Sequence, residues 1–319
     1  MIDKKNRKEL LLVTTALEKT WGCEEDILFL GEWCRRYLRR EAYEHRKYEV
    51  VRNHWDDREK LESDESNLRY LHDTLVKSLT VVLNDIHSVS YSERYWQILL
   101  DPWLVYYVAI IWDRWECIRI CLKEYQPTKT FNVVAKSESK VPRDHAAAIE
   151  LYLNDIWNHQ IYVDILSQIE PQKCEVIFLD IESELPSPVE VGVGFNPSSG
   201  KWVVIKFIDD VLSKFSSGSG IFFGGFIFPF LLQAKLQLRL GQIPISNFSL
   251  IDDLRPTYGL SDKSLRKRAS DLLRDNSPQT DGFHKFLISR LLFDAPSSIL
   301  EDFGQFPEAV TFLVKIKKQ

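Results

Sequence analysis

Three short apolar runs near the amino terminus constrain the possible folds of this chain most. Leu10 to Thr15, Ile27 to Leu30 and Tyr48 to Arg52 have the length of strands, are rich in leucine or β-branched residues, and are separated by polar segments. They predict three strands of one sheet.

A long helical segment follows these strands. From Asp56 onward, leucine and valine recur at helical spacing as far as Val82. Ser88 to Ser90 can then cap a second helix, which is predicted from about Tyr91 to Tyr125. Residues 56–125 are therefore predicted to be a helical hairpin attached to the sheet.

An alternation of strands and helices resumes after the hairpin. Phe131 to Ala135 and Glu175 to Ile181 are predicted strands, with one or two helices between Asp144 and about Leu166. The predicted fold class is α/β, a Rossmann-like and mostly parallel sheet with a helical-hairpin insertion. We expect this domain to span residues 1–246 and residues 247–319 to be a mainly helical extension.

Further elements are predicted in the second half of that domain. They are a helix over Trp202 to Phe215, a strand over Ile221 to Phe223 and a helix near Pro229 to Leu240. Phe215 to Ala234 contains no charged residue, but glycines and a proline interrupt it. We expect a strand, a turn and the start of a helix there, and not a membrane span.

A cluster of polar and aromatic residues follows the third predicted strand. His54, Trp55, Asp56, Asp57 and Arg58 lie where open α/β sheets bind their ligands, at the carboxyl end of a strand. The predicted roles are His54 as general base, Asp56 as its carboxylate partner, Trp55 as a stacking surface and Arg58 as an anion contact. The alternative is a surface junction in which Asp56 or Asp57 caps the following helix.

A second cluster follows the second predicted strand. It includes Glu32 and Trp33, and Trp33 is a second candidate stacking surface. If the two strands are parallel neighbours, Glu32 and Trp33 should converge with His54 and Asp56 on one rim of the sheet.

Three other features are weaker candidates for binding. Arg94, at the start of the second hairpin helix, is a candidate anion contact. Asn158 and His159 could face a cleft or only a neighbouring loop. The arginine-rich stretch 35–47 suits phosphate groups, but two glutamates interrupt it, and a solvated helix face is the alternative.

Charge and cysteine usage exclude several classes of protein. A net charge of -5 does not supply the positive field that nucleic-acid binding requires. The five cysteines contain no CxxC pair, so they predict neither a disulfide framework nor a zinc signature. We expect no metal site and no cofactor, and no HExxH, GxSxG or GxGxxG motif is present.

The amino terminus and the tryptophan content suggest where the protein acts and on what. Met1 to Glu9 is too charged for a signal peptide, so we expect a cytoplasmic protein with at most peripheral membrane contact. The nine tryptophans are compatible with stacking on sugar rings.

Several distinctive blocks of the chain carry a family resemblance. They are Leu12 to Glu18, Leu28 to Cys34, His54 to Lys60, Arg94 to Leu99 and Leu236 to Pro244. Through scattered blocks from about residue 10 to residue 306, the chain resembles a transferase family found alongside enzymes of O-antigen and other surface-polysaccharide biosynthesis.

The resemblance implies a glycosyltransferase-like enzyme that uses an activated sugar or nucleotide-sugar donor and a glycan or lipid-linked acceptor. Members of that family are longer, and their carboxyl-terminal half resembles the second domain of two-domain, GT-B-like transferases. Because nothing of that half is present up to Gln319, we expect a truncated or split form, completed by a separately encoded second half. The alternative is a non-catalytic binding or scaffold protein derived from such a transferase.

Overall fold

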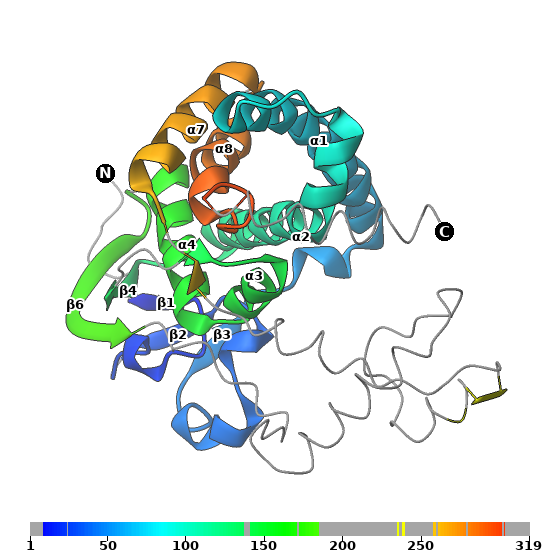
Figure 1. Cartoon of the computed structure of the whole chain (residues 1–319). Helices are drawn as coiled ribbons and strands as arrows, with labels where there is room; N and C mark the ends of the chain where they lie inside the picture. Colours follow the sequence, from blue (N-terminus) through cyan, green and yellow to red (C-terminus); the bar gives the residue numbers. More distant parts are fainter. Residues whose placement is uncertain are drawn as a thin grey trace, which may run out of the picture. The chain divides into compact units, whose positions relative to one another are not determined.

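A parallel sheet of five strands is the centre of the computed structural model (Figure 1). The structure describes residues 9–23, 25–136, 141–170, 172–184, 235, 238–239, 258–259, 261–278, 280–301 and 303. The strands are β1 (Leu10–Val13), β2 (Asp26–Phe29), β3 (Tyr48–Val50), β4 (Lys129–Lys136) and β6 (Glu175–Glu184).

The sheet has the order β3-β2-β1-β4-β6, and every neighbouring pair is parallel. From β1 the chain proceeds outward to β2 and β3 on one side, then returns to form β4 and β6 on the other side. The direction therefore reverses between β1 and β4. In open α/β sheets such a switch point, at the carboxyl ends of the strands, is where ligands bind. The prediction of a Rossmann-like α/β fold is confirmed.

Burial explains why the sequences of the first two strands are almost entirely apolar. Leu11, Leu12 and Val13 of β1 are completely buried, as are the last three residues of β2. A strand with both faces covered has no solvent side on which to place polar residues. β3 lies at the edge of the sheet, and its Tyr48 and Glu49 are exposed.

Short 3-10 helices connect the first three strands. They are η2 (Glu18–Thr20), η3 (Glu32–Cys34) and η4 (Tyr37–Ala42). Aromatic rings pack edge to face around Phe29 of β2, with Trp21 at 5.3 Å, Tyr48 at 5.6 Å and Tyr43 at 5.9 Å between ring centroids. These rings supply the apolar cover that an α-helix would otherwise provide.

The predicted helical hairpin is present as α1 (Arg58–His87) and α2 (Glu93–Ile120). Asp57 caps α1 by accepting from the backbone N–H of Lys60, at 3.2 Å. Ser88 ends α1 in the left-handed conformation, with φ 54°, and Ser92 caps α2. A turn of π-helix, η6 (Cys121–Tyr125), follows α2.

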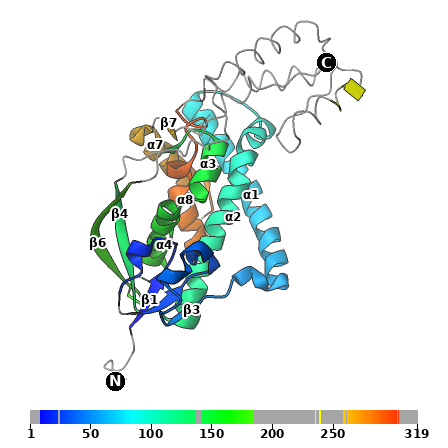
Figure 2. The same cartoon turned by 90° about the horizontal axis from the view of Figure 1, so that it is seen from below.

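The remaining α-helices among the described residues are α3 (His145–Tyr152), α4 (Asp155–Ile169), α7 (Lys263–Asn276) and α8 (Gly282–Asp294). α4 packs on β4 and lies beside α2, while α8 packs against both α2 and α4. The α-helices thus lie together on one side of the sheet (Figure 1), and α1 lies farthest from β6 (Figure 2). A short antiparallel pair, β5 (Val141–Pro142) and β7 (Tyr258–Gly259), joins two distant segments.

All of these elements belong to one compact unit, residues 1–187 with 257–303, and residues 188–256 with 304–319 form a second unit. The elements predicted between Trp202 and Leu240, and the domain boundary predicted at residue 246, lie outside the described residues apart from isolated positions. Within the described part of the chain, no helix combines the length and the apolar character needed to cross a membrane.

Candidate functional site

Four residues meet at the carboxyl end of β1, at the switch point of the sheet. Thr14 and Thr15 directly follow the strand. Trp33 donates from Nε1 to the carbonyl oxygen of Thr14 at 2.9 Å, and Nδ1 of His159 lies 2.7 Å from Oγ1 of Thr14. We call Thr14, Thr15, Trp33 and His159 the switch-point group.

The indole of Trp33 is held in place by its neighbours. It lies parallel to the ring of Tyr162 on α4, with 6.4 Å between centroids and an interplanar angle of 8°. A Cβ atom on Gly31 would lie 2.1 Å from the indole, so only glycine allows this ring position. Trp33 is still 38% exposed, which leaves part of an aromatic surface accessible at the strand end.

His159 is a neutral, completely buried imidazole with one free nitrogen. Burial lowers its pKa from about 6.5 to about 4. Its Nε2 has no hydrogen-bond partner in the described structure, and the same is true of Oγ1 of Thr15. A buried polar atom without a partner costs about 1–3 kcal/mol. Two such atoms at one strand end are the kind of exception that a bound polar ligand would explain.

The low pKa of His159 predicts a specific pH dependence of stability. The unfolded chain takes up this proton near pH 6.5 and the folded protein only near pH 4. Folding is therefore fully favoured above pH 6.5 and penalised progressively as the pH falls toward 4. Between pH 7.5 and 5, this residue should lower the free energy of unfolding by about 2 kcal/mol.

Urea unfolding of wild type and His159→Gln at several pH values checks this prediction. All other titrating groups are shared by the two proteins, so the difference between their free energies of unfolding isolates His159. That difference should change by the expected amount across the window. Parallel pH profiles would contradict the burial of a neutral imidazole.

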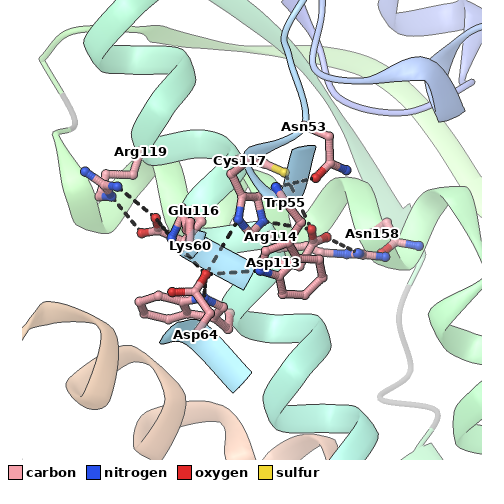
Figure 3. A network of polar contacts seen from close by, with 12 residues as sticks. Asn53, Trp55, Lys60, Asp64, Asp113, Arg114, Glu116, Cys117, Arg119 and Asn158 are labelled. Atoms are coloured by element: carbon pink, nitrogen blue, oxygen red, sulfur yellow. Dashed lines mark hydrogen bonds and ion pairs between the residues drawn. The ribbon is translucent and has the colours of Figure 1, made fainter. Parts of the chain in front are cut away.

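A second group of polar side chains joins the end of β3 to the helical hairpin (Figure 3). His54 lies in η5 (His54–Asp56), the 3-10 turn that follows β3, and its side chain is fully buried. Its Nε2 is 3.1 Å from Oδ1 of Asp113 on α2, and its Nδ1 is 3.8 Å from Oδ2 of Asp64 on α1. We call these residues and their partners the His54 network; the partners are Trp55, Lys60, Trp112, Arg114, Glu116, Cys117, Arg119 and Asn158.

One carboxylate oxygen of Asp64 accepts three hydrogen bonds. Oδ2 of Asp64 accepts from Trp55 Nε1 at 3.0 Å, from Trp112 Nε1 at 2.9 Å and from Lys60 Nζ at 2.8 Å. Burial alone would raise the pKa of Asp64, but the hydrogen bonds from Lys60 and the two indoles outweigh it and hold the pKa below its usual value. Asp64 is therefore ionised at neutral pH.

The Asp113 side connects the network to α4. Burial would raise the pKa of Asp113, but His54 and Arg114 outweigh it, and the pKa lies below its usual value. Arg114 also donates from Nε to Oδ1 of Asn158 at 3.1 Å. Asn158 of the His54 network and His159 of the switch-point group are adjacent residues of α4, so this helix connects the two groups.

Three side chains in this network bring metal-binding atoms close to one another. A ligand atom of each of His54, Asp113 and Cys117 lies within 4.8 Å of the other two, and all three residues are buried. Burial raises the pKa of the Cys117 thiol, so this sulfur is protonated at neutral pH unless an ion displaces the proton.

The structure brings five of the predicted site residues into these two groups. Trp33 and His159 meet at Thr14, and His54, Trp55 and Asn158 belong to the His54 network. The parallel register of β2 and β3 also puts the ends of these strands at the same edge of the sheet, as predicted.

The other predicted residues lie elsewhere. Asp56 is exposed, and because it is two residues after His54 in a 3-10 helix of three residues per turn, its side chain projects in a different direction. The carboxylates that face His54 are Asp64 and Asp113. Arg58 is exposed in the first turn of α1. The structure therefore supplies His54 with a different carboxylate partner from the predicted one.

Glu32 and Arg94 are also on the surface. Glu32 is ion-paired with Arg35. Arg94 donates to Gln97 at 2.9 Å, and it lies about 28 Å from Asp113 along α2, too far to share a site. Arg39 of the basic stretch is paired with Glu18, and Arg46 donates to backbone carbonyls, which agrees with the solvated-face alternative.

Sequence reasoning missed Asp64 and Asp113, although a signal for each was present. Asp64 falls on the stripe formed by Leu61, Leu68 and Leu71, so a carboxylate stands where an apolar residue is expected. Asp113 likewise ends the uninterrupted apolar run from Trp103 to Trp112 on α2. A charged residue on a buried stripe needs a partner inside the protein.

The comparisons with known proteins gave one match. Residues 10–319 match the family described as LIC12162 family transferase. Comparison with curated proteins and with solved structures gave no match.

Proposed function

Because the chain belongs to the LIC12162 family of transferases, we propose that it transfers an activated sugar to an acceptor hydroxyl during the synthesis of surface polysaccharide. The sugar would bind at the switch-point group. The link to O-antigen and other surface polysaccharides rests on the resemblance carried by the blocks around Glu32, His54 and Arg94.

The observation that carries the sugar-binding proposal is that His159 and Trp33 both contact Thr14 at the end of β1. A sugar presents hydroxyl groups at its edge and C–H groups on its face. If a side-chain movement exposes it to the ligand, the buried and unpartnered Nε2 of His159 can donate to or accept from a hydroxyl, depending on the tautomer. The exposed part of the Trp33 indole suits the apolar face.

The reaction class defines what the protein must supply. The acceptor oxygen forms a bond to the anomeric carbon, while the bond from that carbon to the donor phosphate breaks and the phosphate leaves with the electron pair. The acceptor proton passes to a base. His54 as this base stays a prediction, and its carboxylate neighbours in the structure are Asp113 and Asp64.

The amino terminus of α4 is an unsuitable place for the departing phosphate. Asn154 already accepts from the N–H groups of Ile156 and Trp157, and the carboxylate of Asp155, at the first helical position, is ion-paired with Arg36. We therefore propose that the switch-point group, beside the amino terminus of α4, contacts the sugar and that the phosphates of the donor are bound by other residues.

Binding of nucleotide sugars tests the proposal directly. We expect a member of a nucleotide-sugar panel to bind, and Trp33→Ala to weaken that binding by about tenfold or more, equivalent to about 1.4 kcal/mol. Isothermal titration calorimetry measures both. Tyr37→Ala is the matched control, because Tyr37 is an exposed aromatic residue of the next 3-10 helix and should not affect affinity.

Two results would count against the proposal. Equal affinity of Trp33→Ala and wild type would remove the stacking surface from the site. Failure of every nucleotide sugar and sugar acceptor to bind would favour the alternative of a non-catalytic scaffold protein.

A further inference from the structure

The three metal-binding side chains of the His54 network form a compact set of mixed donors. Asp113 and Cys117 are four residues apart on α2, so they project from the same face of the helix, one turn apart. His54 approaches that face from η5. Nitrogen, oxygen and sulfur ligands together suit zinc and related transition metals, whereas magnesium and calcium prefer oxygen alone.

The spacing of the atoms is close to that of a tetrahedral site. Zinc bonds of about 2.0–2.2 Å to nitrogen and oxygen and about 2.3 Å to sulfur put neighbouring ligand atoms about 3.3–3.6 Å apart. Here Nε2 of His54 lies 3.1 Å from Oδ1 of Asp113, and Sγ of Cys117 lies 3.9 Å from the same oxygen. Small shifts of these side chains would complete the geometry.

We propose that His54 Nε2, Asp113 Oδ1 and Cys117 Sγ bind a divalent metal ion of the zinc class. Three protein ligands leave a fourth position for water or another small ligand. The inference is independent of sugar binding at the switch-point group, but it excludes His54 as the general base, because both of its ring nitrogens would be occupied.

The surroundings of the ligands support this assignment. A metal-binding histidine usually donates its second ring N–H to a carboxylate, a carbonyl or water. Nδ1 of His54 faces Oδ2 of Asp64 at 3.8 Å, yet it has no hydrogen-bond partner in the described structure. An ion on Nε2 would require the proton to be on Nδ1, pointing toward this ionised carboxylate. The second oxygen of Asp113 is ion-paired with Arg114.

Most of the charge of a bound ion would be compensated by its ligands. The carboxylate of Asp113 and the thiolate of Cys117 together neutralise a divalent ion, and the thiol proton is released to solvent on binding. Asp64 is neutralised by Lys60, which lies 2.8 Å away. Because Asp113 is also the ion-pair partner of Arg114, a buried divalent ion would leave one net positive charge in the network.

Cobalt(II) is a spectroscopic probe for such a site in the full chain. We expect wild type to bind one Co²⁺, with the visible bands of tetrahedral cobalt and a thiolate-to-cobalt charge-transfer band, and Zn²⁺ to displace it. Cys117→Ser should abolish the charge-transfer band. Asp64→Asn should retain both kinds of band and weaken binding by about 10- to 100-fold, because it removes only an outer partner.

Cys121→Ser is the matched control. Cys121 is also buried and lies one turn beyond Cys117, outside the ligand set, so its replacement should change neither the spectrum nor the affinity. Absence of stoichiometric cobalt binding by wild type would overturn the proposal. So would an unchanged charge-transfer band in Cys117→Ser, or its loss in Cys121→Ser. Circular dichroism verifies folding, and Asp64→Asn, which keeps all three ligands, supplies a second readout if Cys117→Ser does not fold.

Discussion

Replacing Arg266 by methionine is expected to destabilise the protein by about 3–5 kcal/mol, the usual cost of breaking a buried ion pair from one side. Arg266 is only 1% exposed. Its Nη1 donates to the carbonyls of Leu292 at 2.8 Å, Phe293 at 3.1 Å and Ala295 at 2.9 Å. Nε and Nη2 donate to the two oxygens of Glu301, at 2.7 and 2.8 Å.

The position of these carbonyls explains the size of the effect. The last carbonyls of a helix have no partner within the helix, and they form the negative end of its dipole. Arg266 of α7 satisfies them for α8 with a positive charge. Methionine has a similar length but no donors, so it would leave the carbonyls without a donor and the buried carboxylate of Glu301 without its ion-pair partner, with only the hydrogen bond from the backbone N–H of Asp262 remaining.

Urea unfolding measures the loss of unfolding free energy in Arg266→Met, and Arg268→Met is the control. Arg268 lies on the same helix, but its side chain is 63% exposed and its partner Asp85 is 53% exposed. Such a surface pair contributes at most about 1 kcal/mol. The double variant Arg266→Met/Glu301→Met should recover part of the loss, because it also removes the unpaired carboxylate. Equal effects of Arg266→Met and Arg268→Met would contradict the assigned role.

Replacing Asp113 by leucine is the second change for which we expect a large effect, again about 3–5 kcal/mol. Asp113 accepts from His54 and Arg114 in the interior, where water cannot replace it. Its loss leaves a half-buried guanidinium without its carboxylate and a buried imidazole without its hydrogen-bond partner. Urea unfolding in the presence of a chelator measures this effect apart from any metal binding.

Asp101 provides a matched comparison on the same helix. Its Oδ1 lies 3.1 Å from Nε2 of His72, the same distance that separates Asp113 from His54, but this contact does not form a hydrogen bond and the side chain of Asp101 is 36% exposed. Asp101→Leu should therefore cost no more than about 1 kcal/mol. If the two substitutions are equally costly, burial does not determine the strength of the Asp113 pair.

Local pattern was sufficient to predict the regular elements of this fold. The runs at Leu10 to Thr15, Ile27 to Leu30 and Tyr48 to Arg52 became β1, β2 and β3, and residues 56–125 became α1 and α2 with η6. Such elements depend on backbone propensity and on the period of the apolar residues, which are properties of neighbouring positions. The polar cluster at His54 was likewise visible, because it directly follows a strand.

The partners of the site residues depended on contacts between distant segments. Nothing near His54 in the sequence indicates Asp113, which lies 59 positions away, and Thr14 and His159 are 145 positions apart. Asp56 was the obvious partner for His54 only because it is close along the chain.

The sequence by itself therefore determined the α/β class, the strands, the helical hairpin and the regions where polar residues follow strands. Only the tertiary structure decided that His54 lies enclosed between α1 and α2, and that Trp33 and His159 meet at the end of β1. The physical reason is that a periodic pattern indicates only which face of a helix or strand is buried. The packing of the helices on one another and on the sheet decides which buried polar groups come into contact.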